Sequence, residues 1–257
     1  MIALLTDFGE YYPGVMKGVI RKLTDTEVID ITHSVTPQNV MEGAFLLYNA
    51  YKFFPRDTIF VAVVDPGVGS DRKALMIETK NYYFVCPDNG IAYPSAKEDG
   101  IIKIYHIDER ISELVGELSA TFHGRDIFAP AAALLSKGDY KYFKETNEIK
   151  KLNLFKIEIS DTEIRCNVVY IDRFGNVVTD IKDTVINNKK IKKIYFKELE
   201  IPLVRTYSDV GIGEPLALIG SFKTLELSIR EGNFAKEFCV KHGMLRLRWK
   251  DDKQNDG

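Results

Sequence analysis

The sequence of 257 residues has few cysteines and no close pair of them. Cys86, Cys166 and Cys239 lie far apart, and no CxxC motif occurs. This spacing argues against a disulfide framework and against a cysteine-based metal or redox site. Since each cysteine has apolar neighbours, we expect three small core side chains in a reducing compartment.

Long apolar runs and an excess of one charge are also lacking. No apolar stretch approaches the ~20 residues of a membrane-spanning helix. The amino terminus has no basic segment and reaches Asp7 after a very short apolar run, unlike a signal peptide. The 35 basic residues are balanced by 37 acidic ones, which gives no electrostatic case for nucleic acid or an anionic membrane. We therefore expect a cytoplasmic protein that binds a small molecule, without nucleic acid or membrane as partner.

The first half of the chain predicts alternating strands and helices. Short apolar runs that stop at polar residues are typical of buried strands, and apolar residues at helical spacing are typical of helices on a sheet. The expected elements are strand 2–5, helix 14–23, strand 28–32, a helix capped by Asn39 that runs to 54, and strand 60–64. A hairpin at 74–78 and 82–86, strand 101–106 and helix 127–137 follow. This order predicts a doubly wound, mostly parallel sheet.

The second half predicts a smaller β-rich domain. Residues 137–163 are rich in lysine and lose the periodic pattern, so we interpret them as the connection between domains. Strands are expected at 164–171, 177–181, 193–196, 215–219, 225–229 and 244–249. The predicted fold class is therefore α/β: a domain over 1–150 with the parallel sheet, followed by an antiparallel β-sandwich or barrel over 151–257.

Polar residues follow the ends of several predicted strands. Asp7 follows the first strand, Asp65 follows the third and begins the turn DPGVGSDR, and His123 precedes helix 127–137. Open α/β sheets bind ligands beyond the carboxyl ends of their strands, so these residues can share one crevice. Two polar turns of the second half, DRFGN at 172–176 and Gly220-Ser221, are further candidates.

Three conventional chemistries fit these residues poorly. The segment GVGSDR lacks both the third glycine of a dinucleotide fingerprint and the Lys-Ser/Thr of a phosphate loop. Ligand-type side chains at the strand ends form no close pair such as HxH, so no metal is predicted. Ser70 lacks the GxSxG elbow of a nucleophilic serine. We interpret His106 and His242 as a strand-surface residue and a turn residue without function.

Six motifs in chain order resemble the S-adenosyl-L-methionine (SAM) hydrolases, also called SAM hydroxide adenosyltransferases, which are related to the SAM-dependent fluorinase and chlorinase. The motifs are TDFG from Thr6, ITHxVxPxxxxxGA from Ile31, VDPGVGSxR from Val64, CPDNG from Cys86, FHGRDxFAP from Phe122 and IDRFGNxxTDI from Ile171. Each motif alone is a weak signal, but together they cover nearly the whole chain.

The resemblance implies that water or hydroxide attacks C5′ of SAM, which releases L-methionine and leaves adenosine, with no metal or organic cofactor. It also implies a catalytic set of Asp65, Arg72 and His123, which the halogenating relatives lack. As a hypothesis, Asp65 and His123 orient and partly deprotonate the water, while Arg72 keeps Asp65 ionised. The glycines of the turn would let the backbone lie close to the reacting atoms.

The resemblance further implies a set of substrate contacts. Asp7 matches the carboxylate that holds the ribose hydroxyls, and Gln38 stands where the fluorinase has a tryptophan near the ribose. Phe122 and Gly124 flank His123 at the substrate. Residues of the second domain complete the set: Asp172 at the methionine ammonium, Phe174 and Asn176 at the adenine, Tyr207 at the wall of the adenine pocket, Ser221 and the main chain near Glu231 at the methionine and adenine ends, and Glu226 in the same segment.

The resemblance also implies a homotrimer, in which each site lies between the first domain of one subunit and the second domain of a neighbour. Two alternatives to a SAM hydrolase remain at this point. A sensor that binds SAM or adenosine would need the adenine pocket but not the water-activating set. A metal-dependent nucleotide hydrolase would lose turnover in a strong chelator.

Overall fold

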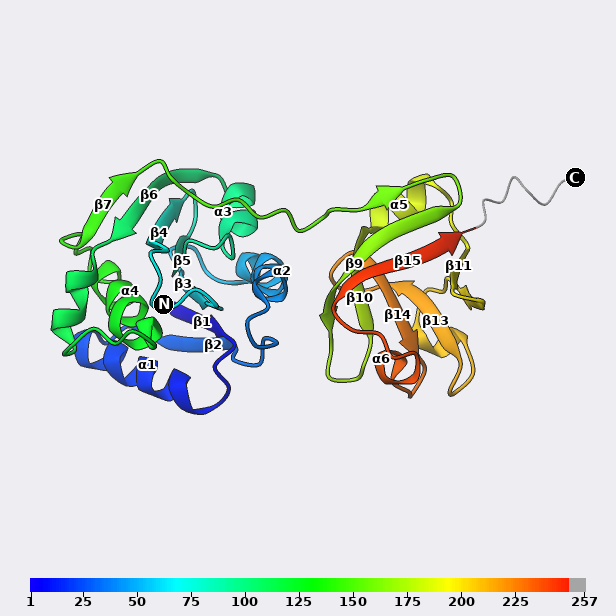
Figure 1. The fold of residues 1–257 in the computed structure, drawn as a ribbon, viewed down its shortest axis with the longest axis horizontal. Coiled ribbons are helices and arrows are strands. Elements are labelled where there is room, and N and C mark those ends of the chain that lie inside the picture. The colour runs from blue at the N-terminus through cyan, green and yellow to red at the C-terminus, as the bar shows by residue number, and fades with distance from the viewer. Residues whose placement is uncertain (250–257) are drawn as a thin grey trace, which may run out of the picture. The chain divides into compact units, whose positions relative to one another are not determined.

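The computed structural model describes residues 1–249, which divide into two compact units, one over Met1–Asn153 and one from Leu154 onward (Figure 1). Each unit has its own sheet and its own hydrophobic core. Within residues 1–249, no helix has the length and apolar character needed to cross a membrane.

The first unit contains a mixed sheet of seven strands in the order β2-β1-β3-β5-β4-β6-β7. The strands are β1 (Ile2–Thr6), β2 (Val28–Thr32), β3 (Ile59–Val63), β4 (Ala74–Thr79), β5 (Tyr83–Pro87), β6 (Ile101–Ile107) and β7 (Phe143–Thr146). Pairings among β2, β1, β3 and β5 are parallel, and those among β5, β4, β6 and β7 are antiparallel. The predicted α/β class is confirmed, and the parallel part is confined to one half of the sheet.

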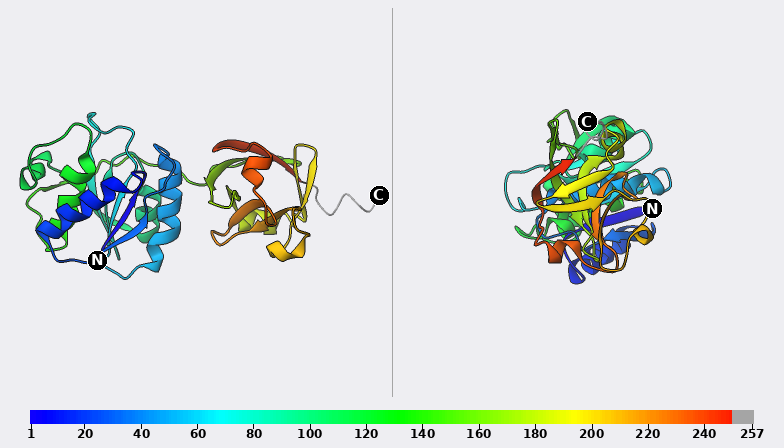
Figure 2. Two further views of the ribbon diagram at one scale, coloured as in Figure 1. Left: turned by 90° about the horizontal axis from the view of Figure 1, so that it is seen from below. Right: turned by 90° about the vertical axis from the view of Figure 1, so that its right-hand side faces the viewer.

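Helices cover both faces of this sheet (Figure 2, left). They are α1 (Tyr11–Leu23), α2 (Val40–Ala50), α3 (Tyr93–Asp99) and α4 (Ala129–Leu135), with short turns η1 (Tyr51–Phe53), η2 (Glu109–Leu114) and the π-helical η3 (Gly124–Phe128). Asn39 caps α2 as predicted, because its side chain accepts a hydrogen bond from the main-chain N–H of Glu42 at 3.1 Å.

Side chains that alternate along β1 and β3 fill two apolar layers, because successive residues of a strand point to opposite faces. On one face, Ile2 and Val61 pack in a cluster with Met16 of α1 and Phe128 of η3. On the other face, the rings of Phe60 and Phe84 stack with centroids 5.3 Å apart. Burying each such side chain contributes roughly 1.5–3 kcal/mol, which makes this sheet a firm support for the loops at its edge.

The predicted patternless connection over 137–163 is wrong in part. β7 lies within it and pairs with β6 through Ile107↔Phe143 and its neighbours, and β8 (Glu158–Ile159) pairs with β9 (Glu163–Ile171) of the second unit. Both strands are short and largely exposed, so they lack the apolar alternation that would have indicated them. The stretch 147–157 contains neither helix nor strand.

The second unit is built on an eight-stranded antiparallel sheet in the order β12-β11-β15-β9-β10-β14-β13, with β8 added beside β9. Its remaining elements are β9 (Glu163–Ile171), β10 (Val177–Lys182), α5 (Asp183–Asn188), β11 (Lys193–Phe196), β12 (Leu199–Pro202), η4 (Tyr207–Asp209), β13 (Pro215–Ile219), β14 (Thr224–Ile229), α6 (Phe234–Glu237) and β15 (Gly243–Trp249). A bridge between Leu203 and Ala217 brings the two edges together, so the sheet is a nearly closed barrel, as predicted.

The expectation for the cysteines holds for two of the three. Cys86 and Cys166 are buried, whereas Cys239 is exposed. Cys239 lies after α6 with a backbone φ of 53°. Its two apolar neighbours in sequence, Phe238 and Val240, had suggested burial. They pack against the core, whereas the cysteine between them does not.

Candidate functional site

The first unit changes the direction of its winding between β1 and β3. From β1 the chain runs through α1 to β2 on one side, and it then returns through α2 to β3 on the other side of β1. Thr6 at the end of β1 is paired with Val63 at the end of β3. Asp7 and Asp65 therefore leave adjacent parallel strands at a topological switch point, where ligands of α/β proteins bind.

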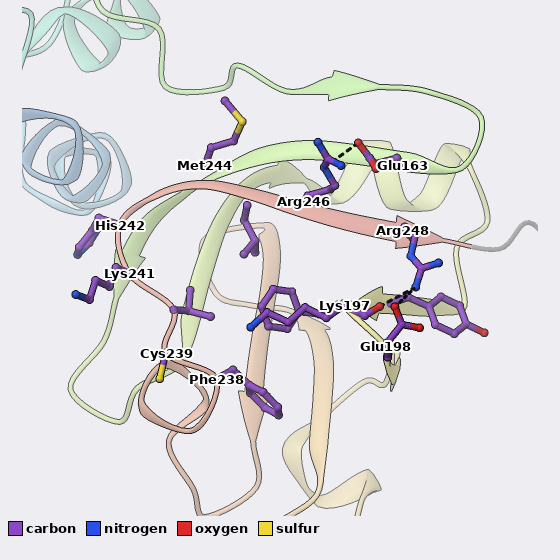
Figure 3. A pocket seen from close by; sticks show the side chains of 14 residues that line it. Glu163, Lys197, Glu198, Phe238, Cys239, Lys241, His242, Met244, Arg246 and Arg248 are labelled. Carbon is purple, nitrogen blue, oxygen red and sulfur yellow. Dashed lines mark hydrogen bonds and ion pairs between the residues drawn. The ribbon is translucent and has the colours of Figure 1, made fainter.

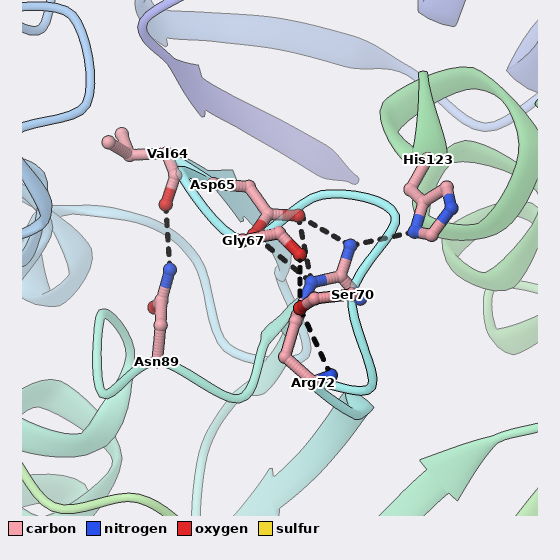
Figure 4. A network of polar contacts seen from close by, with 7 residues as sticks. All are labelled: Val64, Asp65, Gly67, Ser70, Arg72, Asn89 and His123. Atoms are coloured by element: carbon pink, nitrogen blue, oxygen red, sulfur yellow. Dashed lines mark hydrogen bonds and ion pairs between the residues drawn. The ribbon is translucent and has the colours of Figure 1, made fainter. Parts of the chain in front are cut away.

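The guanidinium of Arg72 forms a bidentate ion pair with the carboxylate of Asp65 (Figure 4). Its Nε donates to both carboxylate oxygens, at 3.0 and 2.9 Å, and its Nη2 donates to Oδ2. The side chains of Asp65 and Arg72 are only 3% and 10% exposed. A pair shielded in this way is much less screened by solvent than a surface ion pair, so Asp65 is held as an oriented carboxylate.

The same guanidinium also contacts His123. Nη2 of Arg72 lies 2.7 Å from Nδ1 of His123, and because arginine can only donate, Nδ1 must be the acceptor. The neutral imidazole then carries its proton on Nε2. Burial of His123, followed by the nearby charge of Arg72, lowers its pKa below the usual 6.5, which agrees with a neutral ring.

The turn after β3 is fixed by contacts on both sides. Nδ2 of Asn89 donates to the carbonyl of Val64 at 2.7 Å (Figure 4), and the hydroxyl of Ser70 donates to the carbonyl of Gly67 at 2.6 Å. Gly69 has a φ of +76°, and a Cβ placed on it would lie 2.4 Å from the carbonyl oxygen of Ala120. The glycine therefore permits a close approach to the loop that leads into His123.

Asp7, Gln38, Phe122 and Gly124 also lie at this edge of the first unit. The main-chain N–H of Gln38, a residue with a φ of 65°, donates to Oδ2 of Asp7 at 2.7 Å. Phe122 packs edge-to-face on Phe8, with centroids 5.9 Å apart. A Cβ on Gly124 would lie 2.8 Å from the ring of Phe8, so the loops that contain Asp7 and His123 are packed together.

Two charged residues that follow His123 in sequence pair with each other. Arg125 forms an ion pair with the buried Asp126, and Asp126 also accepts from the main-chain N–H of Ser119 at 2.8 Å. Asp126 thus shapes the loop before His123, while the polar partner of His123 itself is Arg72.

In the second unit, Asp172 organises its own loop. Its Oδ1 accepts from the main-chain N–H groups of Phe174 and Asn176, and its Oδ2 accepts from Nδ2 of Asn176, all at 2.9 Å. Phe174 is left 67% exposed at the tip of this loop. An exposed aromatic ring on a fixed loop is suited to stacking on a flat ligand.

Tyr207 and Glu226 of the second unit are also brought together. The hydroxyl of Tyr207 donates to Oε1 of Glu226 at 2.6 Å, and that of Ser228 donates to the same oxygen at 2.8 Å. Burial and the adjacent Glu226 raise the pKa of Tyr207, so its hydroxyl stays protonated. Gly220, before Ser221, lies against Oε2 of Glu226, whereas Glu231 is exposed on the turn after β14, with a φ of 54°.

A separate pocket of about 640 Å³ in the second unit contains none of the predicted site residues (Figure 3). Its walls include Cys239 and two ion-paired arginines, Arg246 with Glu163 and Arg248 with Glu198. The arginines are paired with carboxylates, but Lys197 and Lys241 also line the pocket, so its basic residues outnumber its acidic ones. Among residues 1–249, no three His, Cys, Asp or Glu side chains are grouped so that they could hold a metal ion.

Two structural roles were not foreseen from the sequence. Asn89 supports the turn that follows β3, although the sequence indicated it only as part of the motif CPDNG. The bridge from Arg72 to His123 joins residues 51 positions apart, so no local pattern could have indicated it.

Comparisons with known proteins place the whole chain in one family. The family model of the SAM hydroxide adenosyltransferase N-terminal domain matches residues 2–144, and that of the C-terminal domain matches residues 166–245. A protein of Methanocaldococcus jannaschii named (R)-S-adenosyl-L-methionine hydrolase is 36% identical, with 94% of this chain and 93% of that protein covered. A fluorinase of Actinopolyspora mzabensis is 25% identical, with 95% of both chains covered.

A solved structure shares the fold over the same length. The crystal structure of an uncharacterized conserved protein from Thermotoga maritima has a TM-score of 0.85 and 34% identity, covering 97% of this chain and 99% of that one. Both family models together cover most of the sequence, and the relative from Methanocaldococcus jannaschii spans nearly all of it. The chain therefore belongs to the SAM hydroxide adenosyltransferase family.

Proposed function

We propose that this protein hydrolyses SAM to adenosine and L-methionine by direct attack of water on C5′. The observation that carries the proposal is the bridge formed by Arg72 between Asp65 and His123 at the switch point of the sheet. The hydrolase name of the relative from Methanocaldococcus jannaschii, which matches along nearly the whole chain, supports the same reaction.

The chemistry of SAM explains why so small a site suffices. The sulfonium is already a good leaving group, so no acid is needed to protonate it. As the water oxygen bonds to C5′, the C5′–S bond breaks and its electron pair stays on sulfur as the neutral thioether of methionine. The protein has to align the water behind C5′ and keep out competing solvent.

The contacts of Arg72 refine the roles of its two partners. Nδ1 of His123 is occupied by Arg72, so His123 orients the water by donating from Nε2 instead of removing its proton. Asp65 accepts from the water and takes its proton as the C5′–O bond forms. Both oxygens of Asp65 already accept from Arg72, so we expect the positioning of the water to supply most of the effect.

The remaining site residues are proposed as substrate contacts. Asp7 would accept from the ribose hydroxyls near Gln38, Phe122 and Gly124. Residues of the second unit would hold the other groups of SAM: Asp172 the methionine ammonium, Phe174, Asn176 and Tyr207 the adenine, and Ser221, Glu226 and Glu231 the surrounding polar atoms. The carboxylate of Asp172 has few acceptor positions left for an ammonium group, since three protein N–H groups already donate to it.

We further propose a homotrimer, with each site formed by the first unit of one subunit and the second unit of its neighbour. The reaction would take place in the cytoplasm, where SAM is used, and would need neither metal nor organic cofactor. A monomeric mass in solution together with full activity would contradict the trimer, and loss of turnover in a strong chelator would contradict the metal-free reaction.

The experiment that tests the function combines product identification with matched variants. Wild type, Asp65→Asn and His123→Phe are incubated with each sulfonium epimer of SAM, because the relative is named for the R form. We expect adenosine and methionine in equal amounts from wild type, and less than a hundredth of that rate from either variant. Glu145→Gln, which removes an exposed carboxylate paired with Lys103, serves as the control and should stay fully active. SAM that is bound but left intact by wild type would instead identify a sensor.

A further inference from the structure

A second pocket lies beside Arg72 in the first unit. It measures about 310 Å³, and its walls come from the end of the turn, from β4, from β6 and from η2. The lining residues are Ser70, Asp71, Arg72, Lys73, Ala74, His106, Ile107 and Glu109. His106, interpreted from the sequence as a surface residue without function, thus shares a pocket with the residue that organises the site.

Two buried polar atoms of these lining residues have no hydrogen-bond partner among residues 1–249. One is Nη1 of Arg72, and the other is Nε2 of His106. Nε and Nη2 of Arg72 are fully used by Asp65 and His123, so Nη1 is the remaining end of the fork. Buried donors and acceptors are nearly always satisfied by protein or by ordered water, because an unpaired buried group is costly.

The charges of the pocket favour water over an ion. Arg72 and Lys73 face three carboxylates, those of Asp71 and Glu109 in the pocket and that of Asp65 on the guanidinium. No surplus of positive charge is left to hold an anion, and a donor such as Nη1 cannot ligate a cation. Water can accept from Nη1 and can either donate to or accept from an imidazole nitrogen. A polar pocket of this size has room for several waters.

We propose that this pocket is a hydration site in which water links Nη1 of Arg72 to Nε2 of His106, so that His106 is a positioning residue for Arg72. The water fixes Nη1 of the guanidinium, while Nε and Nη2 hydrogen-bond to Asp65 and His123. The inference rests on the proposed function, because the purpose of the link is to orient the groups that align the attacking water.

Three substitutions of His106 separate positioning from folding. Gln places a polar atom near the position of Nε2, Asn places one near Nδ1, and Leu places none. We expect His106→Leu and His106→Asn to lower kcat about tenfold with KM unchanged within about twofold, as for loss of one hydrogen bond that orients a charged group. His106→Gln should recover most of kcat. Equal rates for wild type and His106→Leu, or equal losses for Gln and Asn, would overturn the proposal.

A measurement without substrate tests the link even if SAM is not turned over. A high-resolution crystal structure of wild type should show an ordered water within hydrogen-bond distance of Nη1, connected to Nε2 directly or through a second water. The water at Nη1 should persist in His106→Gln and be lost or displaced in His106→Leu. An ion in the pocket, or unchanged water at Nη1 in the leucine variant, would refute the role of His106. Failure of the proposed function alone would leave this water in place but give no adenosine from wild type.

Discussion

Replacement of Gly69 by alanine should damage both stability and catalysis, and Gly138→Ala provides a matched control. Both glycines have a left-handed φ, +76° and +70°, but a Cβ on Gly138 would meet nothing within 4 Å, whereas one on Gly69 would lie 2.4 Å from the carbonyl oxygen of Ala120. The backbone cost of about 1 kcal/mol is common to both substitutions. The loop at Ala120 must yield by about 1 Å to restore ordinary contact, and overpacking of this kind adds ~1–3 kcal/mol.

The difference between these two variants isolates the close approach. In denaturant unfolding at unchanged m value, Gly69→Ala should be less stable than Gly138→Ala by about 1–3 kcal/mol. A shift of about 1 Å between Arg72 and His123 should also lower kcat about a hundredfold, while Gly138→Ala keeps its rate. If the two variants unfold at the same denaturant concentration and turn SAM over equally fast, the packing of the turn against the loop at Ala120 does not position the site.

Further predictions concern the groups around the guanidinium. Arg72→Lys should lower kcat/KM at least a hundredfold, because an ammonium cannot hydrogen-bond to both oxygens of Asp65 and also reach His123. Steady-state rates near those of wild type would contradict this. Burial and then the charge of Arg72 lower the pKa of His123, so kcat/KM should fall in acid with an apparent pKa below 6.5. The protein should also lose stability as pH falls from 6.5 towards the pKa of the folded state, because in that range only the imidazole of the unfolded chain takes up a proton. A pH profile with this limb at or above 6.5 would refute the neutral ring. Asn89→Ala removes the donor to the carbonyl of Val64 and the acceptor for the main-chain N–H of Ile91, and it should cost about 1–3 kcal/mol in unfolding free energy. Asn89→Asp keeps the acceptor but turns an oxygen towards the carbonyl of Val64, so it should be no better.

The sequence was most informative where the hydrophobic pattern was strongest. The buried strands β1 and β3 were predicted to within a residue, because continuous apolar runs bounded by polar turns have few other interpretations. The edge strands β7 and β12 were missed, as was α5. These three elements are short and polar. They are ordered by pairing or packing with other parts of the chain and not by the local conformational preference of their residues.

The candidate site was predictable as a set of residues but not as a set of contacts. The position of Asp65 after a strand and that of His123 before a helix follow from the order of elements. That Arg72 contacts both residues at once depends on the packing of the turn against the loop at Ala120. This packing cannot be read from the sequence. The tautomer of His123, and with it the assignment of Asp65 as the proton acceptor, follows only from that contact.

The most direct test of the reaction is turnover of SAM in water enriched in oxygen-18, with mass analysis of both products. Direct attack on C5′ predicts one heavy oxygen in adenosine, at the 5′-hydroxyl, and none in methionine. Adenosine without the label, or products such as adenine or S-adenosylhomocysteine, would contradict attack of water at C5′ by the site built on Asp65, Arg72 and His123.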